Sequence, residues 1–245
     1  MSLDSVSIVV PVVNEEASLE RTLRSVAALS PPPVEVLVVD GGSSDRTLEM
    51  ARHFPVNVLT SRQRSRAAQM QTGAQAAQGD LLCFLHADTW LPPDAVEVMR
   101  QTLSDSRIAA AGFTSLMTGP RGTRWATSFH NFVKSYYGPL LFRPWSFFRR
   151  HLRLLFGDQA IFCRRAQFLD VGGFRGAGLM EEAVLCERLC RLGRIVQIGR
   201  TVWSSDRRVA EWGFLRAHAT YLRIALTWGL GRSTERLRHL YPDIR

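Results

Sequence analysis

Lysine is almost absent from this chain of 245 residues, although the chain is strongly basic. Of its 31 basic residues 30 are Arg and Lys134 is the single Lys, so guanidinium groups carry the formal net charge of +9. Guanidinium groups bind planar oxyanions well, and such a surface suits phosphorylated ligands, nucleic acid or anionic lipid. Composition alone does not choose among these partners.

Long apolar runs are also missing. No window approaches the roughly 18 uninterrupted apolar residues of a membrane-spanning helix. The N-terminus carries Asp4, Glu15 and Glu16 where a secretory signal peptide has a basic start and an apolar run. We therefore expect the protein to be made and kept in the cytoplasm.

Cysteine is scarce, and its spacing does not suit a metal site. The four cysteines include no C-x-x-C pair, and only two of them are close together, at a helical spacing of four residues. This pattern argues against zinc. We expect reduced thiols in the core at Cys83, Cys163, Cys186 and Cys190.

The remaining composition is that of an ordinary globular protein. With 46% apolar and 22% charged residues, the chain is neither disordered nor collagen-like. Its length favours one large domain, which we place at residues 1–245. The first 120 residues carry 9 basic and 13 acidic groups, whereas the rest carry 22 and 9. The two parts are therefore expected to face different partners.

The first 115 residues alternate between apolar strands and amphipathic helices. The run 34–39 is apolar except for Glu35, which is typical of a strand covered on both faces of a parallel sheet. The pattern is that of a doubly wound α/β fold, in which ligands bind at the carboxyl ends of strands. Asn14, Asp40 and Asp88 fall at such ends. Strands are predicted over 5–10, 34–39, 56–60 and 81–85, and helices from Asn14, from Asp45, over 64–77 and after Pro93.

The second part of the chain is less regular. Helices are predicted over 128–137, 180–192 and 210–230 from their apolar spacing. Between the first two lies the segment 139–156, in which four Arg residues alternate with aromatic and aliphatic ones. That segment is too charged to span a membrane. It either covers the core as a lid or lies among lipid headgroups with its aromatics inward.

Several motifs stand in order along this pattern. Residues 10–16 read Val-Pro-Val-Val-Asn-Glu-Glu, residues 38–47 read Val-Val-Asp-Gly-Gly-Ser-Ser-Asp-Arg-Thr, and Ala-Asp follows the fourth apolar strand. With the segments 66–70, 157–160, 172–174 and 180–182, they resemble the family 2 glycosyltransferases of GT-A fold over most of the chain. More narrowly, the chain resembles a bacterial subgroup in which His-Ala-Asp-Thr, here residues 86–89, replaces the usual D-x-D motif.

The resemblance implies a fold and an activity. The fold would be a GT-A, Rossmann-like, mostly parallel sheet flanked by helices. Residues 1–115 would bind the nucleotide sugar, and 116–245 would form a helical and irregular acceptor-side half. The activity would be metal-dependent, inverting transfer of a sugar from a UDP- or GDP-type donor to an acceptor hydroxyl. The acceptor stays open and includes lipid-linked compounds.

The resemblance also implies partners and a donor site. Nucleic acid is not an expected partner, while the segment 139–156 admits peripheral contact with anionic lipid on the inner face of the membrane. Asp40 would accept hydrogen bonds from the nucleoside, or it only caps the helix after the turn that follows it. Arg66 would reach the base or the diphosphate, or it belongs to a solvated face. Arg207 and Arg208 would close on the diphosphate as a bidentate clamp, or they belong to a charged surface run. The candidate donor-binding residues are Pro11, Glu15, Asp40, Arg66, Arg207 and Arg208.

A divalent cation would neutralise the leaving diphosphate, and Mn²⁺ or Mg²⁺ is the expected ion. Asp88 is its candidate ligand. His86 stands where the family usually has an acidic residue, and imidazole suits Mn²⁺ better than Mg²⁺. It coordinates the ion directly, acts through water, or positions Asp88.

Glu182 is the candidate general base, because it aligns with the second member of the family's acidic pair, usually an Asp. Glu181 would support substrate or backbone, although two acidic residues also complement a helix N-terminus. Asp158 resembles the acceptor-side Asp, with a structural turn as the alternative. His218 is expected to be an ordinary helix-face residue.

Two other functions fit parts of the sequence. A sugar-phosphate nucleotidyltransferase also places carboxylates at strand ends, but it has a Gly-rich loop after the first strand, and residues 11–16 contain no Gly. A non-catalytic, Arg-rich module that binds nucleic acid or membrane would lose its ligand steeply with salt. A protein that keeps the donor pocket without catalysis is a further possibility.

Overall fold

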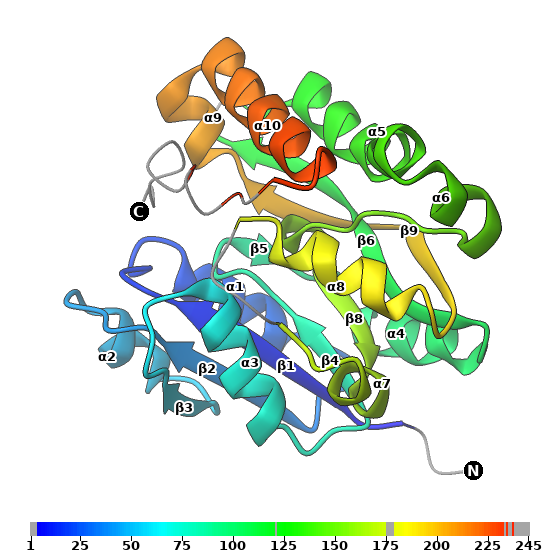
Figure 1. The fold of residues 1–245 in the computed structure, drawn as a ribbon. Coiled ribbons are helices and arrows are strands. Elements are labelled where there is room, and N and C mark those ends of the chain that lie inside the picture. The colour runs from blue at the N-terminus through cyan, green and yellow to red at the C-terminus, as the bar shows by residue number, and fades with distance from the viewer. Residues whose placement is uncertain (1–3, 121, 175–178, 233, 235–236, 238–245) are drawn as a thin grey trace.

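One mixed sheet runs through both parts of the chain in the computed structural model, which describes residues 4–120, 122–174, 179–232, 234 and 237 (Figure 1). Its strand order is β3-β2-β1-β4-β8-β6-β9-β5, with β7 paired to β6. The elements of the first part are β1 (Val6–Val12), α1 (Leu19–Ala27), β2 (Glu35–Asp40), α2 (Thr47–Ala51), β3 (Asn57–Thr60), α3 (Arg66–Ala76), β4 (Leu81–Phe84), β5 (Thr89–Trp90) and α4 (Ala95–Ser104).

The second part adds longer strands and a separate group of helices. Its elements are β6 (Ile108–Gly119), β7 (Gly122–Thr123), α5 (Trp125–Phe142), α6 (Pro144–Arg150), the 3₁₀ helix η1 (Gly157–Gln159), β8 (Ile161–Arg164), α7 (Arg165–Asp170), α8 (Glu181–Leu189), β9 (Arg194–Ser205), α9 (Arg207–Trp212) and α10 (Phe214–Gly229).

Strand β1 lies at the centre of the first part and is buried along its whole length. Its side chains alternate between two apolar cores, with Ile8 and Val10 on one face of the sheet and Val9 on the other. Helices α1 and α4 cover the first face, and α3, α7 and α8 cover the second. Helices on both faces explain why the strands of this part are apolar throughout.

The α/β assignment from the sequence is confirmed, and strands β1 to β4 are parallel to one another as predicted. Strand β8 is antiparallel to both β4 and β6, while β6 and β9 run parallel. Strands β6 and β9 thus run in the same direction as β1 to β4, which confirms the predicted mostly parallel sheet, and β5, β7 and β8 are its antiparallel strands. The four cysteines are free and buried, also as predicted.

The first helix does not begin at Asn14, as the sequence suggested, but at Leu19. Asn14 has a positive φ of 52°, and its Oδ1 accepts a hydrogen bond of 2.8 Å from the Ser44 backbone N–H. Its own N–H donates to Ser43 Oγ at 2.9 Å. The Asn14 side chain thus joins the loops after β1 and β2 and is not a helix cap.

All four strands of the second part, β6 to β9, were missed, and β7 has only two residues. The other three lack a clear strand pattern in their sequences. Strand β6 passes through Ala109-Ala110-Ala111-Gly112, which contains no β-branched residue. Strand β9 mixes Arg and Gln with apolar residues, and few of its side chains are fully buried. Strand β8 has only four residues.

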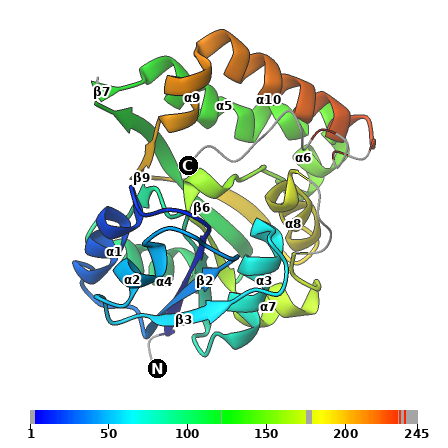
Figure 2. The same cartoon turned by 90° about the vertical axis from the view of Figure 1, so that its left-hand side faces the viewer.

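The helix expected over 210–230 is two helices, α9 and α10, because Gly213 between them adopts a φ of 76°. Together with α5, they lie at the end of the molecule remote from α2 and β3 in both views (Figures 1 and 2). The segment 139–156 is divided. Leu152, Leu154 and Leu155 are buried in the core, so its second half is the fixed cover that was one of the two expectations.

Across the described residues, none of the helices has the length and apolarity required to cross a membrane.

Candidate active site

The sheet topology gathers the predicted site residues at one edge. Residues 86–88 follow β4, and β8 runs antiparallel to β4 with Phe84 paired to Ile161. The start of β8 therefore meets the end of β4, which brings Gly157 and Asp158 beside His86. Strand β9 ends at the same place, since the Ser205 N–H donates to the Asp88 carbonyl at 3.0 Å.

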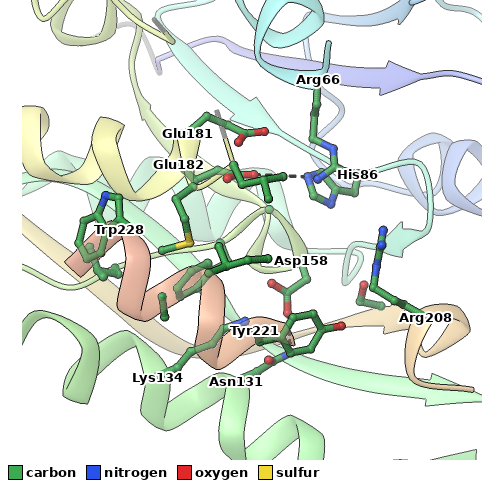
Figure 3. A pocket seen from close by; sticks show the side chains of 18 of the residues that line it. Arg66, His86, Asn131, Lys134, Asp158, Glu181, Glu182, Arg208, Tyr221 and Trp228 are labelled. Atoms are coloured by element: carbon green, nitrogen blue, oxygen red, sulfur yellow. Dashed lines mark hydrogen bonds and ion pairs between the residues drawn. The ribbon is translucent and has the colours of Figure 1, made fainter. Parts of the chain in front are cut away.

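A pocket of about 560 Å³ opens at this edge. Figure 3 shows its side chains converging from several elements, with Glu181 and Glu182 on α8, Asn131 and Lys134 on α5, and Tyr221 and Trp228 on α10. Of the residues predicted from the sequence, the pocket is lined by Pro11, Glu15, Arg66, His86, Asp88, Asp158, Glu181, Glu182, Arg207 and Arg208.

Asp40 is the predicted donor-site residue that does not line the pocket. It is 3% exposed, and its carboxylate accepts hydrogen bonds from the backbone N–H groups of Gly42 and Ser43 and from the Ser43 hydroxyl. These bonds hold the turn after β2, whereas the alternative left open by the sequence, a cap of the following helix, is not what Asp40 does, because α2 begins only at Thr47. Contact between Asp40 and a nucleoside stays a prediction.

Arg207 connects two acidic side chains on the donor side of the pocket. Its Nη2 lies 2.9 Å from Asp88 Oδ2, and its Nη1 lies 3.0 Å from Glu15 Oε2. All three side chains are at most a quarter exposed. The two carboxylates therefore favour a positive charge between them, where Arg207 now lies. The sequence analysis expected the diphosphate and the metal ion next to these same residues.

His86 and Glu182 face each other at the base of the pocket, with 3.8 Å between His86 Nε2 and Glu182 Oε1 (Figure 3). Burial and the neighbouring Glu181 carboxylate raise the pKa of Glu182 to about 8, while the charge of Arg66 opposes this shift. Burial and the charges of Arg66 and Arg208 hold the pKa of His86 well below 6.5. At neutral pH this places an uncharged imidazole against a buried carboxyl group whose pKa is raised.

Gly157 allows this close approach. A Cβ atom at this position would overlap the His86 ring and lie 2.9 Å from Glu182 Oε1. Any other residue would push the two side chains away from each other or out of the pocket. In the Gly-Asp pair at 157–158, Gly157 thus leaves room for His86 and Glu182, and Asp158 supplies a carboxylate.

We expect Gly157→Ala to reduce turnover strongly, because displacing a reacting group by about 1 Å typically costs about 10²-fold. The measurement is the initial rate of sugar release from the donor, together with the midpoint of thermal unfolding. Gly199→Ala is the matched control, since a Cβ atom at Gly199 meets nothing within 4 Å. Equal rates for the two variants would contradict the tight packing that we assign to Gly157.

The acceptor side of the pocket contains polar groups that the sequence did not single out. Asn131 donates a hydrogen bond of 2.8 Å to Asp158 Oδ2. Lys134 Nζ lies 4.1 Å from the centre of the Phe156 ring, and burial lowers its pKa against the pull of Asp158 and Glu182. The one available signal was that Lys134 is the single lysine in a chain that otherwise uses Arg.

His218 behaves as the helix-face residue that was predicted. It lies on α10 with Nδ1 2.8 Å from the Phe214 carbonyl, and its ring stacks on Phe214 with 3.9 Å between the centroids.

The far side of the pocket is apolar and was not predicted. In Figure 3, Trp228 and Arg208 lie on opposite sides of Asp158 and Glu182. No motif marks these positions, because aliphatic and aromatic residues on amphipathic helices usually form core. The apolar lining comprises Leu141, Phe142, Leu154, Leu179, Met180, Leu222, Ile224, Ala225, Leu226 and Trp228.

The side chains of the pocket suit a divalent cation that takes only one or two of its ligands from the protein. Among the described residues no three or more His, Cys, Asp and Glu side chains form a metal-binding group. Mg²⁺ and Mn²⁺ are nevertheless often held by one or two carboxylates, with substrate phosphates completing the shell. Asp88 fits this arrangement, since its carboxylate already lies beside a cationic group. The Nε2 atom of His86 faces Glu182. Contact between His86 and a metal ion stays a prediction.

Comparison with known proteins identifies the family. Residues 7–171 match the model described as Glycosyl transferase family 2. The chain belongs to this family. The match ends before α8 and α10, so the pocket residues on these two helices lie beyond the matched part.

Curated relatives share only part of their length with this chain. Glycosyltransferase AglE of Haloferax volcanii is 30% identical over 140 residues, which are 54% of this chain and 46% of that protein. The undecaprenyl-phosphate 4-deoxy-4-formamido-L-arabinose transferase of Pectobacterium carotovorum is 36% identical over 106 residues, 38% of this chain and 32% of that protein. The chain thus spans less than half the length of these two relatives.

Solved structures confirm the GT-A fold at low sequence identity. Glucosyl-3-phosphoglycerate synthase of Mycobacterium tuberculosis, solved with Mn²⁺, UDP and phosphoglyceric acid, has a TM-score of 0.66 at 22% identity. That match covers 94% of this chain and 79% of the synthase. The mannosyltransferase PcManGT of Pyrobaculum calidifontis, solved with GDP-Man and Mn²⁺, has a TM-score of 0.67 at 18% identity and covers 98% and 65% of the two chains.

Proposed function

We propose that the pocket binds a UDP- or GDP-sugar and that the enzyme transfers its sugar, with inversion, to an acceptor hydroxyl. The observation that carries the proposal is the presence inside one pocket of several Arg residues and of the buried Glu182 carboxyl group, which faces His86. Residues 1–115 supply most of the donor side, and residues 116–245 supply the base and the acceptor side. Family membership and the neighbours solved with UDP and GDP-Man support the choice of donor.

Positive side chains hold the diphosphate in this proposal. Arg66, Arg207 and Arg208 line the pocket, and the charges of all three act on His86. Guanidinium groups bind phosphate oxygens bidentately. Asp88 would hold Mn²⁺ or Mg²⁺, and such an ion neutralises the charge that develops on the leaving diphosphate. Arg207, now between Glu15 and Asp88, then has the bound phosphates as a further partner.

Glu182 performs the proton transfer. It takes the proton from the acceptor hydroxyl while that oxygen attacks the anomeric carbon, and the bond to the diphosphate breaks on the opposite side. The uncharged His86 lies beside the same carboxyl group and limits its movement. Asp158, fixed by Asn131, orients the acceptor. Glu181, at the first turn of α8, keeps the supporting role assigned from the sequence.

Turnover should depend on pH through Glu182. The base must be deprotonated, and because its pKa is raised to about 8, the rate should rise with pH and level off above about 8. Below that value it should fall about tenfold per pH unit, as expected for a single protonation. His86 stays uncharged over this range. A pH–rate profile of kcat from pH 6 to about 9.5 tests this, and a rate that is flat or falls with rising pH would contradict it.

A panel of nucleoside diphosphates tests the donor assignment. A ligand at 100 times its dissociation constant stabilises the folded protein by about 2.7 kcal/mol, which is visible as a shift of the unfolding midpoint. We expect UDP or GDP to give this shift with Mn²⁺ present and a smaller one with EDTA. Equal shifts for all nucleotides, or none for any of them, would contradict the proposal.

The proposed location of the protein is the cytoplasm, and the four free, buried cysteines support it.

A further inference from the structure

Large apolar side chains are exposed together on three helices. Leu215, Trp125 and Phe148 are 82%, 70% and 67% exposed. Helices α5 and α10 lie side by side, with Phe142 against Trp228 and His130 against His218, and α6 follows α5 directly (Figures 1 and 2). We call this surface the apolar face; it consists of Trp125, Phe129, Phe132, Leu140, Leu141, Trp145, Phe148, Phe214, Leu215, Leu222 and Leu226.

The charge on these helices has one sign. None of α5, α6 and α10 contains an Asp or a Glu. Arg149 on α6 and Arg216 and Arg223 on α10 are exposed among the apolar side chains. The Arg149 guanidinium lies 4.7 Å from the centre of the Trp145 ring, so cationic and aromatic groups stand next to each other at the surface. This combination of aromatic rings and Arg is typical of helices that lie in a lipid headgroup region.

The pocket opens onto the apolar face. Leu141, Leu222 and Leu226 line the pocket and are also 66%, 55% and 43% exposed. They come from both α5 and α10, so the pocket and the apolar face share side chains on these two helices. The apolar lining that includes Trp228 is therefore continuous in character with the exposed surface of the same helices.

We infer that the apolar face rests on an anionic lipid bilayer and that the pocket receives from it the hydrocarbon part of an amphiphilic acceptor. This inference rests on the proposed function and names the class of acceptor. A second copy of the chain is the less favourable occupant. In a symmetric dimer through this face Arg would meet Arg, because the three helices offer no acidic partner.

Co-sedimentation with vesicles tests the docking. The full chain should bind phosphatidylcholine vesicles that contain phosphatidylglycerol, bind pure phosphatidylcholine vesicles weakly, and be released by high salt. Arg149→Glu/Arg223→Glu should weaken the binding by more than roughly tenfold, since each basic group near an anionic surface contributes roughly a fivefold factor in partitioning. Leu215→Ser should weaken it by removing an exposed apolar side chain.

Matched variants elsewhere on the surface are the controls. Arg24→Glu/Arg52→Glu makes the same change in net charge on α1 and at the end of α2, and Val34→Ser removes an apolar side chain that is 58% exposed. Both controls should bind vesicles as the unaltered protein does. Binding lost equally in face and control variants would overturn the inference, as would light scattering that shows a dimer broken by the face variants without any vesicle binding.

A small amphiphile tests the opening. Octyl glucoside below its micelle concentration should change the fluorescence of Trp228, whereas glucose should not. The change should be smaller in Trp228→Phe, in which Trp125 and Trp145 of the apolar face remain, and smaller in Ala225→Leu, which narrows the apolar lining. The same response to glucose and octyl glucoside would overturn the apolar route.

Nucleotide binding separates this inference from the proposed function. Nucleotide binding by the unaltered protein and by Arg149→Glu/Arg223→Glu, without any vesicle preference, would overturn the membrane inference alone. Vesicle binding without binding of any nucleoside diphosphate would overturn the proposed function, whereas the inference that the apolar face docks on a membrane would still hold.

Discussion

Glu182→Gln should keep nucleotide binding and lower turnover by roughly 10² to 10⁴-fold, the usual contribution of a general base. The side chain is 7% exposed and faces His86, and its amide analogue has nearly the same shape but cannot accept the proton. Donor affinity should change little, because the Arg residues hold the diphosphate. The measurement is kcat and KM for donor hydrolysis, with nucleotide affinity by calorimetry.

Neighbouring variants make this result specific. Glu181→Gln should lower the rate less, since consecutive helical residues point about 100° apart and cannot both reach one hydroxyl. Glu182→Asp should retain substantial activity if α8 moves slightly, and Glu49→Gln on α2 is the control for a lost surface charge. A normal rate for Glu182→Gln with an inactive Glu181→Gln would reverse the two roles.

Asp88→Ala should abolish the increase in nucleotide affinity that Mn²⁺ or Mg²⁺ produces. Loss of an outer-shell group already costs roughly 10 to 100-fold in metal affinity, so loss of the carboxylate should cost at least that much. Sugar transfer should fall with it. His86→Ala should have a smaller effect, because a neutral imidazole contributes no charge to the ion.

The control for Asp88 is Asp94→Ala, which removes an exposed carboxylate paired with Arg200 at 2.9 Å. Titrations of UDP and GDP with Mn²⁺ and with EDTA give the comparison. Asp88→Ala also removes a partner of Arg207, so its affinity in EDTA must be measured as the baseline. An unchanged response to metal in Asp88→Ala would show that another residue holds the ion.

The sequence predicted the first part of the fold because that part obeys local rules. Strands β1, β2 and β4 are buried on both faces and read as apolar runs, and the residues at their ends are short-range motifs. Asn14 shows where local rules fail, since its side chain bonds to Ser44, thirty residues away. A capping residue and a loop-joining residue look the same in sequence.

The second part depends on contacts that no local pattern records. Strand β6 is paired with β8 and β9. Its small residues Ala109 to Gly112 have low strand propensity, but they allow close packing between these strands and their neighbours. Lys134 and Trp228 are near Asp158 and Glu182 only because α5 and α10 cross over the pocket. The site residues at motifs were therefore predictable, whereas the apolar lining was not.

The anomer released from the donor tests the central claim most directly. UDP-glucose and GDP-mannose are α-linked, so ¹H NMR of donor hydrolysis in the presence of Mn²⁺ shows which sugar anomer appears first. We predict the β-anomer together with the nucleoside diphosphate, at a rate that Glu182→Gln lowers. The α-anomer as first product would contradict inversion, and a nucleoside monophosphate with sugar 1-phosphate would contradict glycosyl transfer itself.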